Sequence, residues 1–193
     1  MSKVEVSRKT RETDIKVVLD LEGKGKCNIN VDIGFFKHML DSFCRHSGIF
    51  LNIIADGDLE VDFHHTVEDI GIVLGMAIDK ALNDKKGINR FGWAIVPMDD
   101  SLSTVAIDLS GRPYLIYNVK FPTEKIKDFD VELFKEFFKA LSDNAKMNLH
   151  ILNNYGDNSH HIIESIFKAF AKAFKMAITK GNSNIIPSTK GVL

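Results

Sequence analysis

The pattern His-His-x-x-Glu occurs twice in this chain of 193 residues, at residues 64–68 and 160–164, so the two copies begin 96 residues apart. Each copy opens a run in which apolar residues recur at helical spacing. Adjacent histidines diverge by about 100° around a helix, whereas residues three and four positions apart share a face. The sequence therefore predicts two helices, each of which presents two imidazoles and a carboxylate from its first turns.

Imidazole and carboxylate together suit divalent ions such as Mn, Fe, Co and Zn. Paired histidines at a helix start can also be simple capping or solvated residues. The matching second copy favours metal ligands, and two imidazole directions on each helix favour two ions over one. Thiolate has no evident part in this site, because Cys27 and Cys44 lack metal-ligand spacing and are expected to be reduced thiols of a cytosolic protein.

Composition limits the remaining classes of function. The hydrophobic fraction of 45% is enough for a real core, and the net charge of −1 argues against bulk binding to nucleic acid or to a membrane surface. No apolar run approaches the roughly 20 residues that span a bilayer, and the charged start of the chain is unlike a signal peptide. We expect a cytoplasmic protein without nucleic-acid or membrane partners.

Alternation and helical periodicity predict one unit of six elements in the first half of the chain. Strands are expected at residues 3–9, 15–21, 27–33 and 49–55, and helices at residues 35–45 and 64–83. A second unit follows, in which residues 105–112 resemble residues 17–24, with strands at 114–119 and 147–152 and helices at 131–142 and 158–178. Asn158 or Ser159 is expected to cap the last helix.

We therefore expect an α+β fold of two duplicated βββαβα units, residues 1–90 and 91–193, packed as a pseudo-symmetric pair in one compact catalytic unit. Each unit should be a mostly antiparallel sheet with two helices on one face. The tail at residues 186–191 is expected to be an ordered turn or a flexible arm.

Three further histidines lie outside the pentads. Each alone is more typical of a structural residue, but His38 and His150 become credible extra ligands because a six-coordinate ion needs more donors than one helix supplies. His46 ends its helix and can equally be a capping cation.

The segment Arg8-x-Thr10-x-Glu12-Thr13 follows the first strand. Its residues can be an exposed edge with alternating charges, or Glu12 can be a carboxylate base oriented by Arg8. Basic residues elsewhere are dispersed, and two of them closely follow a glycine, where backbone can approach an anion: Arg90 and Arg112.

Motifs along essentially the whole chain resemble imidazoleglycerol-phosphate dehydratase. The resemblance rests on the two pentads, the first of them continued by Asp69, on Phe167-Lys168-Ala169, on the segment from Arg8 to Thr13, on His38-Met39-Leu40-Asp41, on Pro97-Met98-Asp99-Asp100 and on Pro187-Ser188-Thr189-Lys190-Gly191. It implies the Mn-dependent dehydration of D-erythro-imidazoleglycerol phosphate to imidazoleacetol phosphate in histidine biosynthesis. It also implies two Mn(II) ions per active site and a 24-mer whose active sites lie between subunits.

The resemblance also implies roles for individual residues. Glu12 becomes the acid/base and Lys168 lies near the substrate. The implied metal ligands are His38, His64, His65, Glu68, His150, His160, His161 and Glu164, and the implied substrate and phosphate residues are Arg8, Glu12, Arg90, Arg112, Ser188 and Lys190. Two positions depart from many relatives: Lys37 stands where Asp is common, and Ser42 where Gln is common.

The expected chemistry needs both carboxylate and metal. The hydrogen to be removed lies on a carbon next to a hydroxyl and is not acidic, so a base alone would remove it slowly. Lewis acids at the two ring nitrogens favour an imidazolate that expels the ring-adjacent hydroxyl as water. Glu12 can then take the acidified proton, and the enol becomes the ketone.

Two rival hypotheses remain. Histidine and glutamate at helical spacing also serve zinc hydrolases, and ligands that only join subunits would make a metal-storage or structural oligomer. A base together with an anion site favours the dehydratase.

Overall fold

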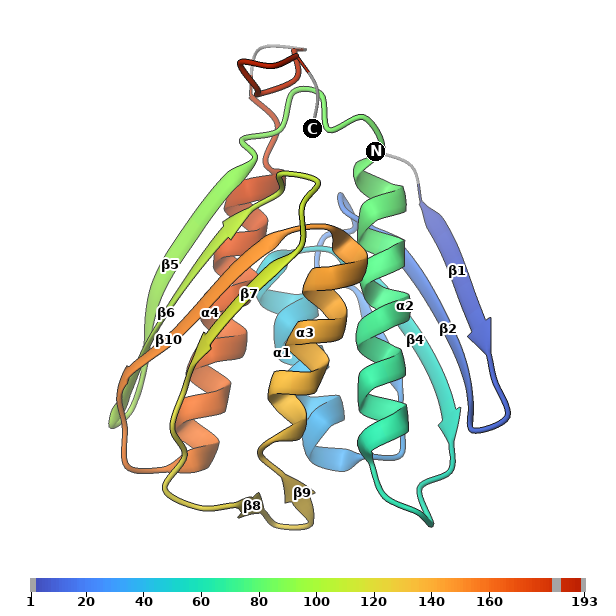
Figure 1. Ribbon diagram of the computed structural model, residues 1–193, viewed down its shortest axis with the longest axis vertical. Coiled ribbons are helices and arrows are strands. Elements are labelled where there is room, and N and C mark those ends of the chain that lie inside the picture. Colours follow the sequence, from blue (N-terminus) through green and yellow to red (C-terminus); the bar gives the residue numbers. More distant parts are fainter. Residues whose placement is uncertain (1–2, 182–184, 192–193) are drawn as a thin grey trace.

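The computed structural model describes residues 3–181 and 185–191, and it consists of two four-stranded sheets with four helices between them (Figure 1). The first half runs β1 (Val4–Lys9), β2 (Thr13–Asp20), β3 (Cys27–Asn30), α1 (Gly34–Ser47), β4 (Phe50–Gly57) and α2 (His64–Leu82). The predicted βββαβα order is therefore confirmed for this half. In β2 buried positions alternate with more exposed ones, and Ile15, Val17 and Leu19 are fully buried against the helices.

The second half repeats the order with one addition. It runs β5 (Phe91–Met98), β6 (Ser101–Asp108), β7 (Tyr114–Asn118), a short hairpin of β8 (Lys125–Ile126) and β9 (Phe129–Asp130), α3 (Leu133–Ala145), β10 (Asn148–Tyr155) and α4 (Ser159–Ile178). The hairpin was not predicted, because two-residue strands are too short to show alternation. Its Phe129 is fully buried and stacks 5.9 Å from Phe36 of the first half.

The two sheets have the same topology. Their strand orders are β1-β2-β4-β3 and β5-β6-β10-β7. In each sheet the third strand of the half pairs in parallel with the strand that follows the first helix, and the other pairs are antiparallel. This equivalence confirms the duplicated, mostly antiparallel units.

The helices pack across the two halves. α1 lies against α4, α2 lies against α3, α2 covers β1 and β2, and α4 covers β5 and β6 (Figure 1). The ring of Phe43 on α1 stacks 4.8 Å from Phe170 on α4. The boundary expected at residue 90 falls between α2 and β5, and the two halves share one core.

Glycine allows α2 and α3 to approach closely. A Cβ atom at Gly75 would lie 2.8 Å from the carbonyl oxygen of Leu141, and one at Gly71 would lie 2.7 Å from the carbonyl oxygen of Phe137. Both helices run in the same direction past this contact, since the later glycine meets the later residue of α3.

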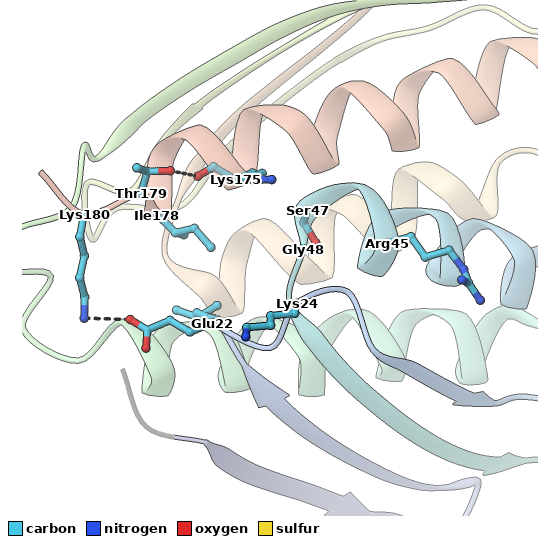
Figure 2. Close-up of a pocket in the computed structure, with 10 residues that line it drawn as sticks. Glu22, Lys24, Arg45, Ser47, Gly48, Lys175, Ile178, Thr179 and Lys180 are labelled. Atoms are coloured by element: carbon cyan, nitrogen blue, oxygen red, sulfur yellow. Dashed lines mark hydrogen bonds and ion pairs between the residues drawn. The ribbon is translucent and has the colours of Figure 1, made fainter.

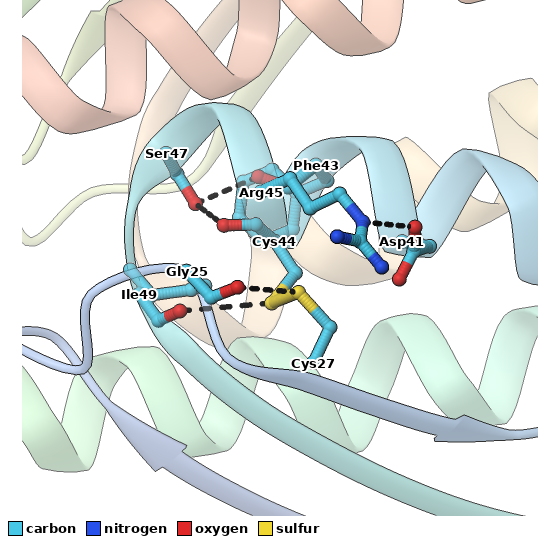
Figure 3. Close-up of a disulfide and its surroundings, with 8 residues drawn as sticks. All are labelled: Gly25, Cys27, Asp41, Phe43, Cys44, Arg45, Ser47 and Ile49. Atoms are coloured by element: carbon cyan, nitrogen blue, oxygen red, sulfur yellow. Dashed lines mark hydrogen bonds and ion pairs between the residues drawn. A yellow bond between two sulfur atoms is a disulfide. The ribbon is translucent and has the colours of Figure 1, made fainter.

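The expectation of two reduced thiols was wrong. Cys27 at the start of β3 and Cys44 in α1 form a disulfide, with their Cα atoms 6.1 Å apart (Figure 3). Spacing along the chain could not predict this contact, because it depends on how α1 packs beside its own sheet. No helix among the described residues is long and apolar enough to cross a membrane.

Candidate metal centre

Two helices from different halves bring three predicted ligands together. His38 lies on α1, and His160 and Glu164 lie on the first turns of α4. One possible ligand atom from each of these residues lies within 4.8 Å of the others. The Nε2 atom of His160 is 3.1 Å, and that of His38 is 3.8 Å, from Oε2 of Glu164. Two imidazole nitrogens and one carboxylate oxygen in this arrangement fit a borderline divalent ion.

The other oxygen of Glu164 is held by Lys168. Their Oε1 and Nζ atoms are 2.8 Å apart, one helical turn along α4. Burial would raise the pKa of Glu164. Hydrogen bonds from Lys168 and His160, together with the charges of Lys168 and His38, outweigh burial, so the pKa lies below its usual value. Lys168 thus keeps the carboxylate ionised and leaves Oε2 directed at the histidines.

The first turn of α4 is fixed by its cap. The side-chain oxygen of Asn158 accepts hydrogen bonds from the backbone N–H groups of His160 and His161, as expected for one of the two predicted caps. Nδ1 of His161 donates to Oδ1 of Asp100, whose Oδ2 accepts from the backbone N–H groups of Asp157 and Asn158. The hydrogen bond from His161 holds the pKa of Asp100 at about 2.

The pentad on α2 forms a second group of predicted ligands. Nε2 of His64 lies 3.9 Å from Oε2 of Glu68, and Nδ1 of His65 lies 2.9 Å from Oδ2 of Asp58. The hydrogen bond that His65 donates to Asp58 raises the pKa of His65 above its usual value. Among the described residues, no third histidine, cysteine or carboxylate ligand atom gathers with His64 and Glu68.

Glu12 lies beside this second group. Its Oε2 is 3.9 Å from Nδ1 of His65, and its side chain is exposed. The hydroxyl of Thr10 accepts hydrogen bonds from the backbone N–H groups of Glu12 and Thr13, which makes the loop a defined turn. The predicted base is therefore adjacent to predicted metal ligands.

Arg8 contacts protein in this structure. Its guanidinium donates to Oδ2 of the buried Asp69, and the hydroxyl of Thr13 donates to the same oxygen. Asp69 directly follows Glu68 on α2. Hydrogen bonds to Asp69 therefore hold the loop that bears Glu12 against the helix that carries the predicted ligands.

The predicted phosphate residues lie at the other end of α4. Arg90 donates two hydrogen bonds to the carboxylate of Asp108 and a third, of 3.0 Å, to the carbonyl oxygen of Pro187. This contact brings the tail with Ser188 and Lys190 to Arg90, and the tail is an ordered turn closed by Gly191 N–H to Ser188 O. Arg112 is exposed on the turn before β7.

The remaining histidines are apart from these groups. His150 lies exposed on β10, on the sheet face away from the helices, beside Ala106 of β6. His46 is half-buried on α1, and burial, together with the charges of Lys172 and Lys168, lowers its pKa. That direction favours a neutral ring and disfavours the capping-cation interpretation of His46.

The two departures from the family pattern have different surroundings. Lys37 is exposed on α1. Ser42 is buried, and its hydroxyl has no hydrogen-bond partner among the described residues.

A cavity of about 550 Å³ lies away from the ligand groups, where α1 and α4 end (Figure 2). It is lined by basic residues, among which Arg45 pairs with Asp41 and Lys180 with Glu22. Cations at helix C-termini offset the partial negative charge there, which accounts for Arg45 in the last turn of α1 and Lys175 in the last turn of α4.

Sequence reasoning missed the carboxylates that hold the site residues. Asp58, Asp69 and Asp100 each accept from a predicted site residue, but none received a role from the sequence. Asp69 and Asp100 lie within motifs that carry the resemblance, which was a usable signal. Asp58 had no such signal.

The duplicated fold and the histidine–glutamate groups define an α+β protein with a candidate metal site near the N-termini of its helices. A family model described as imidazoleglycerol-phosphate dehydratase matches residues 31–174. The imidazoleglycerol-phosphate dehydratase of Geobacter sulfurreducens is 53% identical over 193 residues, covering 99% of this chain and 98% of that protein. That of Cereibacter sphaeroides is 50% identical and covers both chains fully.

Solved structures agree with this assignment. The Staphylococcus aureus imidazoleglycerol-phosphate dehydratase superposes with a TM-score of 0.85 at 40% identity, covering 93% of this chain and 100% of that one. The Pyrococcus furiosus protein superposes with a TM-score of 0.84 at 39% identity, covering 97% of this chain and 100% of that one. The chain belongs to the imidazoleglycerol-phosphate dehydratase family, and its class of activity is that of a dehydratase, a hydro-lyase.

Proposed function

We propose that this chain catalyses the Mn(II)-dependent dehydration of D-erythro-imidazoleglycerol phosphate to imidazoleacetol phosphate, a step of histidine biosynthesis, in the cytoplasm. The observation that carries the proposal is the group of His38, His160 and Glu164, which two halves of the chain build together. Membership in the dehydratase family supplies the substrate class.

Two Mn(II) ions per active site are part of this proposal. Their ligands would come from the group on α1 and α4 and from the group on α2, with further donors from His65, His161 and His150. Such ions, when bound, supply Lewis acidity at the two ring nitrogens of the substrate imidazole.

Glu12 would move the proton. It is exposed, lies 3.9 Å from the ring of His65 and is held by the Thr10 turn. Its carboxylate would take the hydrogen from the side-chain carbon next to the one that loses its hydroxyl as water. The resulting enol becomes the ketone when the carbon next to the ring gains a proton. Lys168, paired with Glu164, would hold the ligand carboxylate in place near the substrate.

The phosphate would be bound by Ser188, Lys190 and Arg112, with Arg90 holding the tail through Pro187. Arg90 N–H bonds to the carbonyl oxygen of Ala177 near the end of α4, whereas His160 lies on its first turn. Helical rise separates these points by about 25 Å, too far for one small substrate. The phosphate residues and the ligands of one active site would therefore come from different subunits.

Self-association to a 24-mer is part of the same proposal. The outer face of the second sheet exposes large apolar side chains on β5, namely Phe91, Trp93 and Ile95. Trp93, Ala106 and His150 lie in one row across β5, β6 and β10. A second copy that covers this face would bury the apolar row and receive His150 as a ligand.

The test is dehydratase activity on imidazoleglycerol phosphate by chelator-treated protein, before and after Mn(II) is added back, with native mass followed at each stage. We expect activity and a large assembly to return together. Assembly without turnover would instead favour a structural metal joint. Peptide hydrolysis with zinc and no dehydration would favour a metallohydrolase.

A further inference from the structure

We infer that Asp58 and Asp100 are positioning residues, which set the ring orientation and tautomer of His65 and His161 so that Nε2 of each ring accepts a metal ion. This inference rests on the metal site proposed above and adds two residues to which that proposal gives no role.

The same ring atom faces a carboxylate in both halves. Nδ1 of His65 lies 2.9 Å from Oδ2 of Asp58, and Nδ1 of His161 donates to Oδ1 of Asp100. A neutral imidazole that donates from Nδ1 carries its lone pair on Nε2. Metal-binding histidines commonly donate their other ring N–H to a carboxylate, which fixes the ring and raises its basicity as a ligand.

The two carboxylates are themselves held. Asp100 accepts from the backbone N–H groups of Asp157 at 2.7 Å and Asn158 at 3.0 Å, so its position is tied to the start of α4. Asp58 donates its backbone N–H to the carbonyl oxygen of Glu12, at 3.1 Å, and its side chain is only 17% exposed. Each carboxylate thus orients its histidine from a fixed point.

Simple duplication does not explain the arrangement. Asp58 follows β4 and precedes His65 by seven residues, whereas Asp100 lies between β5 and β6, 61 residues before His161. The residue seven positions before His161 is Asn154, and its Oδ1 accepts from Thr104. Two different elements therefore make the same histidine–carboxylate contact, which indicates that the contact itself is required.

The other charged groups near these rings do not replace Asp58 or Asp100 as the partner of Nδ1. Oε2 of Glu12 is 3.9 Å from Nδ1 of His65, beyond hydrogen-bond distance. Oδ2 of Asp99 is 3.5 Å from Nε2 of His161, and its side chain is 69% exposed, so it can move away when Nε2 takes a metal.

The test compares the Mn(II) affinity of the unchanged protein, without substitutions, with that of the Asp58→Asn and Asp100→Asn variants. Mn(II) alone is the probe, and free Mn(II) is measured by electron paramagnetic resonance. Asp56→Asn is the matched control, because Asp56 is an exposed carboxylate on β4 two residues before Asp58. We expect each positioning variant to bind Mn(II) about 10–100-fold more weakly and the control to match the unchanged protein.

A second readout separates positioning from a purely structural role. Nitrogen-15 chemical shifts of the metal-free protein report the tautomer of each ring, and we expect His65 and His161 to carry the proton on Nδ1 and to lose that preference in the respective variants. Unchanged tautomers, or Mn(II) affinities within twofold of the unchanged protein, would overturn the inference alone. No Mn(II) binding by the unchanged protein would overturn the proposed metal site and this inference together.

Discussion

The guanidinium of Arg8 on β1 donates to the carboxylate of Asp69, the residue that follows the predicted ligand Glu68 on α2. The hydroxyl of Thr13 donates to the same carboxylate oxygen. The two ends of the loop that bears Glu12 are therefore held against the helix that carries the predicted ligands His64 and Glu68.

Replacing Asp69 with Ala should loosen this loop and reduce stability. The side chain of Asp69 is 10% exposed, whereas that of Arg8 is 36% exposed, so solvent partly compensates Arg8 for the lost partner. We expect the free energy of unfolding to fall by about 1–3 kcal/mol in urea denaturation at fixed protein concentration, with a lower kcat.

Asp79→Ala is the control, since Asp79 lies on α2 like Asp69 and forms a more exposed ion pair with Lys146 at the end of α3. It should cost about 1 kcal/mol or less. Equal losses of unfolding free energy in the two variants would show that the Arg8–Asp69 contact stabilises the protein no more than an exposed ion pair does.

Replacing Glu12 with Gln should stop turnover and leave substrate binding in place. The amide keeps the size of the side chain but cannot take a proton, and general acid–base catalysis contributes about 10²–10⁴-fold. Steady-state kinetics and calorimetric titration with substrate measure the two effects. Glu60→Gln, an exposed carboxylate lining the same surface hollow, should retain normal kcat. Full activity of the Glu12 variant would show that Glu12 is not the base of the reaction.

Replacing Gly75 with Ala should destabilise the protein although alanine favours helices. The added Cβ would lie 2.8 Å from Leu141 O and 2.9 Å from Ala145 N, so α2 and α3 must separate. We expect a loss of about 1–3 kcal/mol, read as a lower Tm. Gly34→Ala, at the start of α1, meets nothing within 4 Å and should be neutral or slightly stabilising. A raised Tm for both would argue against tight α2–α3 packing.

Replacing Trp93 with Lys should weaken self-association. The side chain is 61% exposed on the outer face of the second sheet, where a buried partner surface would not accept a charge. Native mass spectrometry should show smaller species, and activity should fall with them. Ile54→Lys, on the outer face of the first sheet at 44% exposure, is the comparison that assigns the effect to one sheet. An unchanged mass for the Trp93 variant would exclude that face from the assembly.

The individual helices and strands could be predicted from the sequence because their patterns of apolar and polar residues are periodic. Alternation in β2 and helical spacing after residue 64 placed these elements within one or two residues, and the repeated pentad predicted the duplication. The two ligand-bearing helix starts were predicted for the same reason, since i,i+4 spacing brings His64 to Glu68 and His160 to Glu164 in any α-helix.

Only the tertiary structure decided which ligands meet. His38 lies at Glu164 of the other half because α1 packs on α4, and no periodicity within either helix encodes that partner. The disulfide between Cys27 and Cys44 and the carboxylates of Asp58, Asp69 and Asp100 depend in the same way on contacts between separate elements. The sequence by itself determined the helices and the histidine–glutamate pairs on them, because those depend on neighbours three and four residues away. Close packing of the two half-chains determined which of these residues meet in the candidate site.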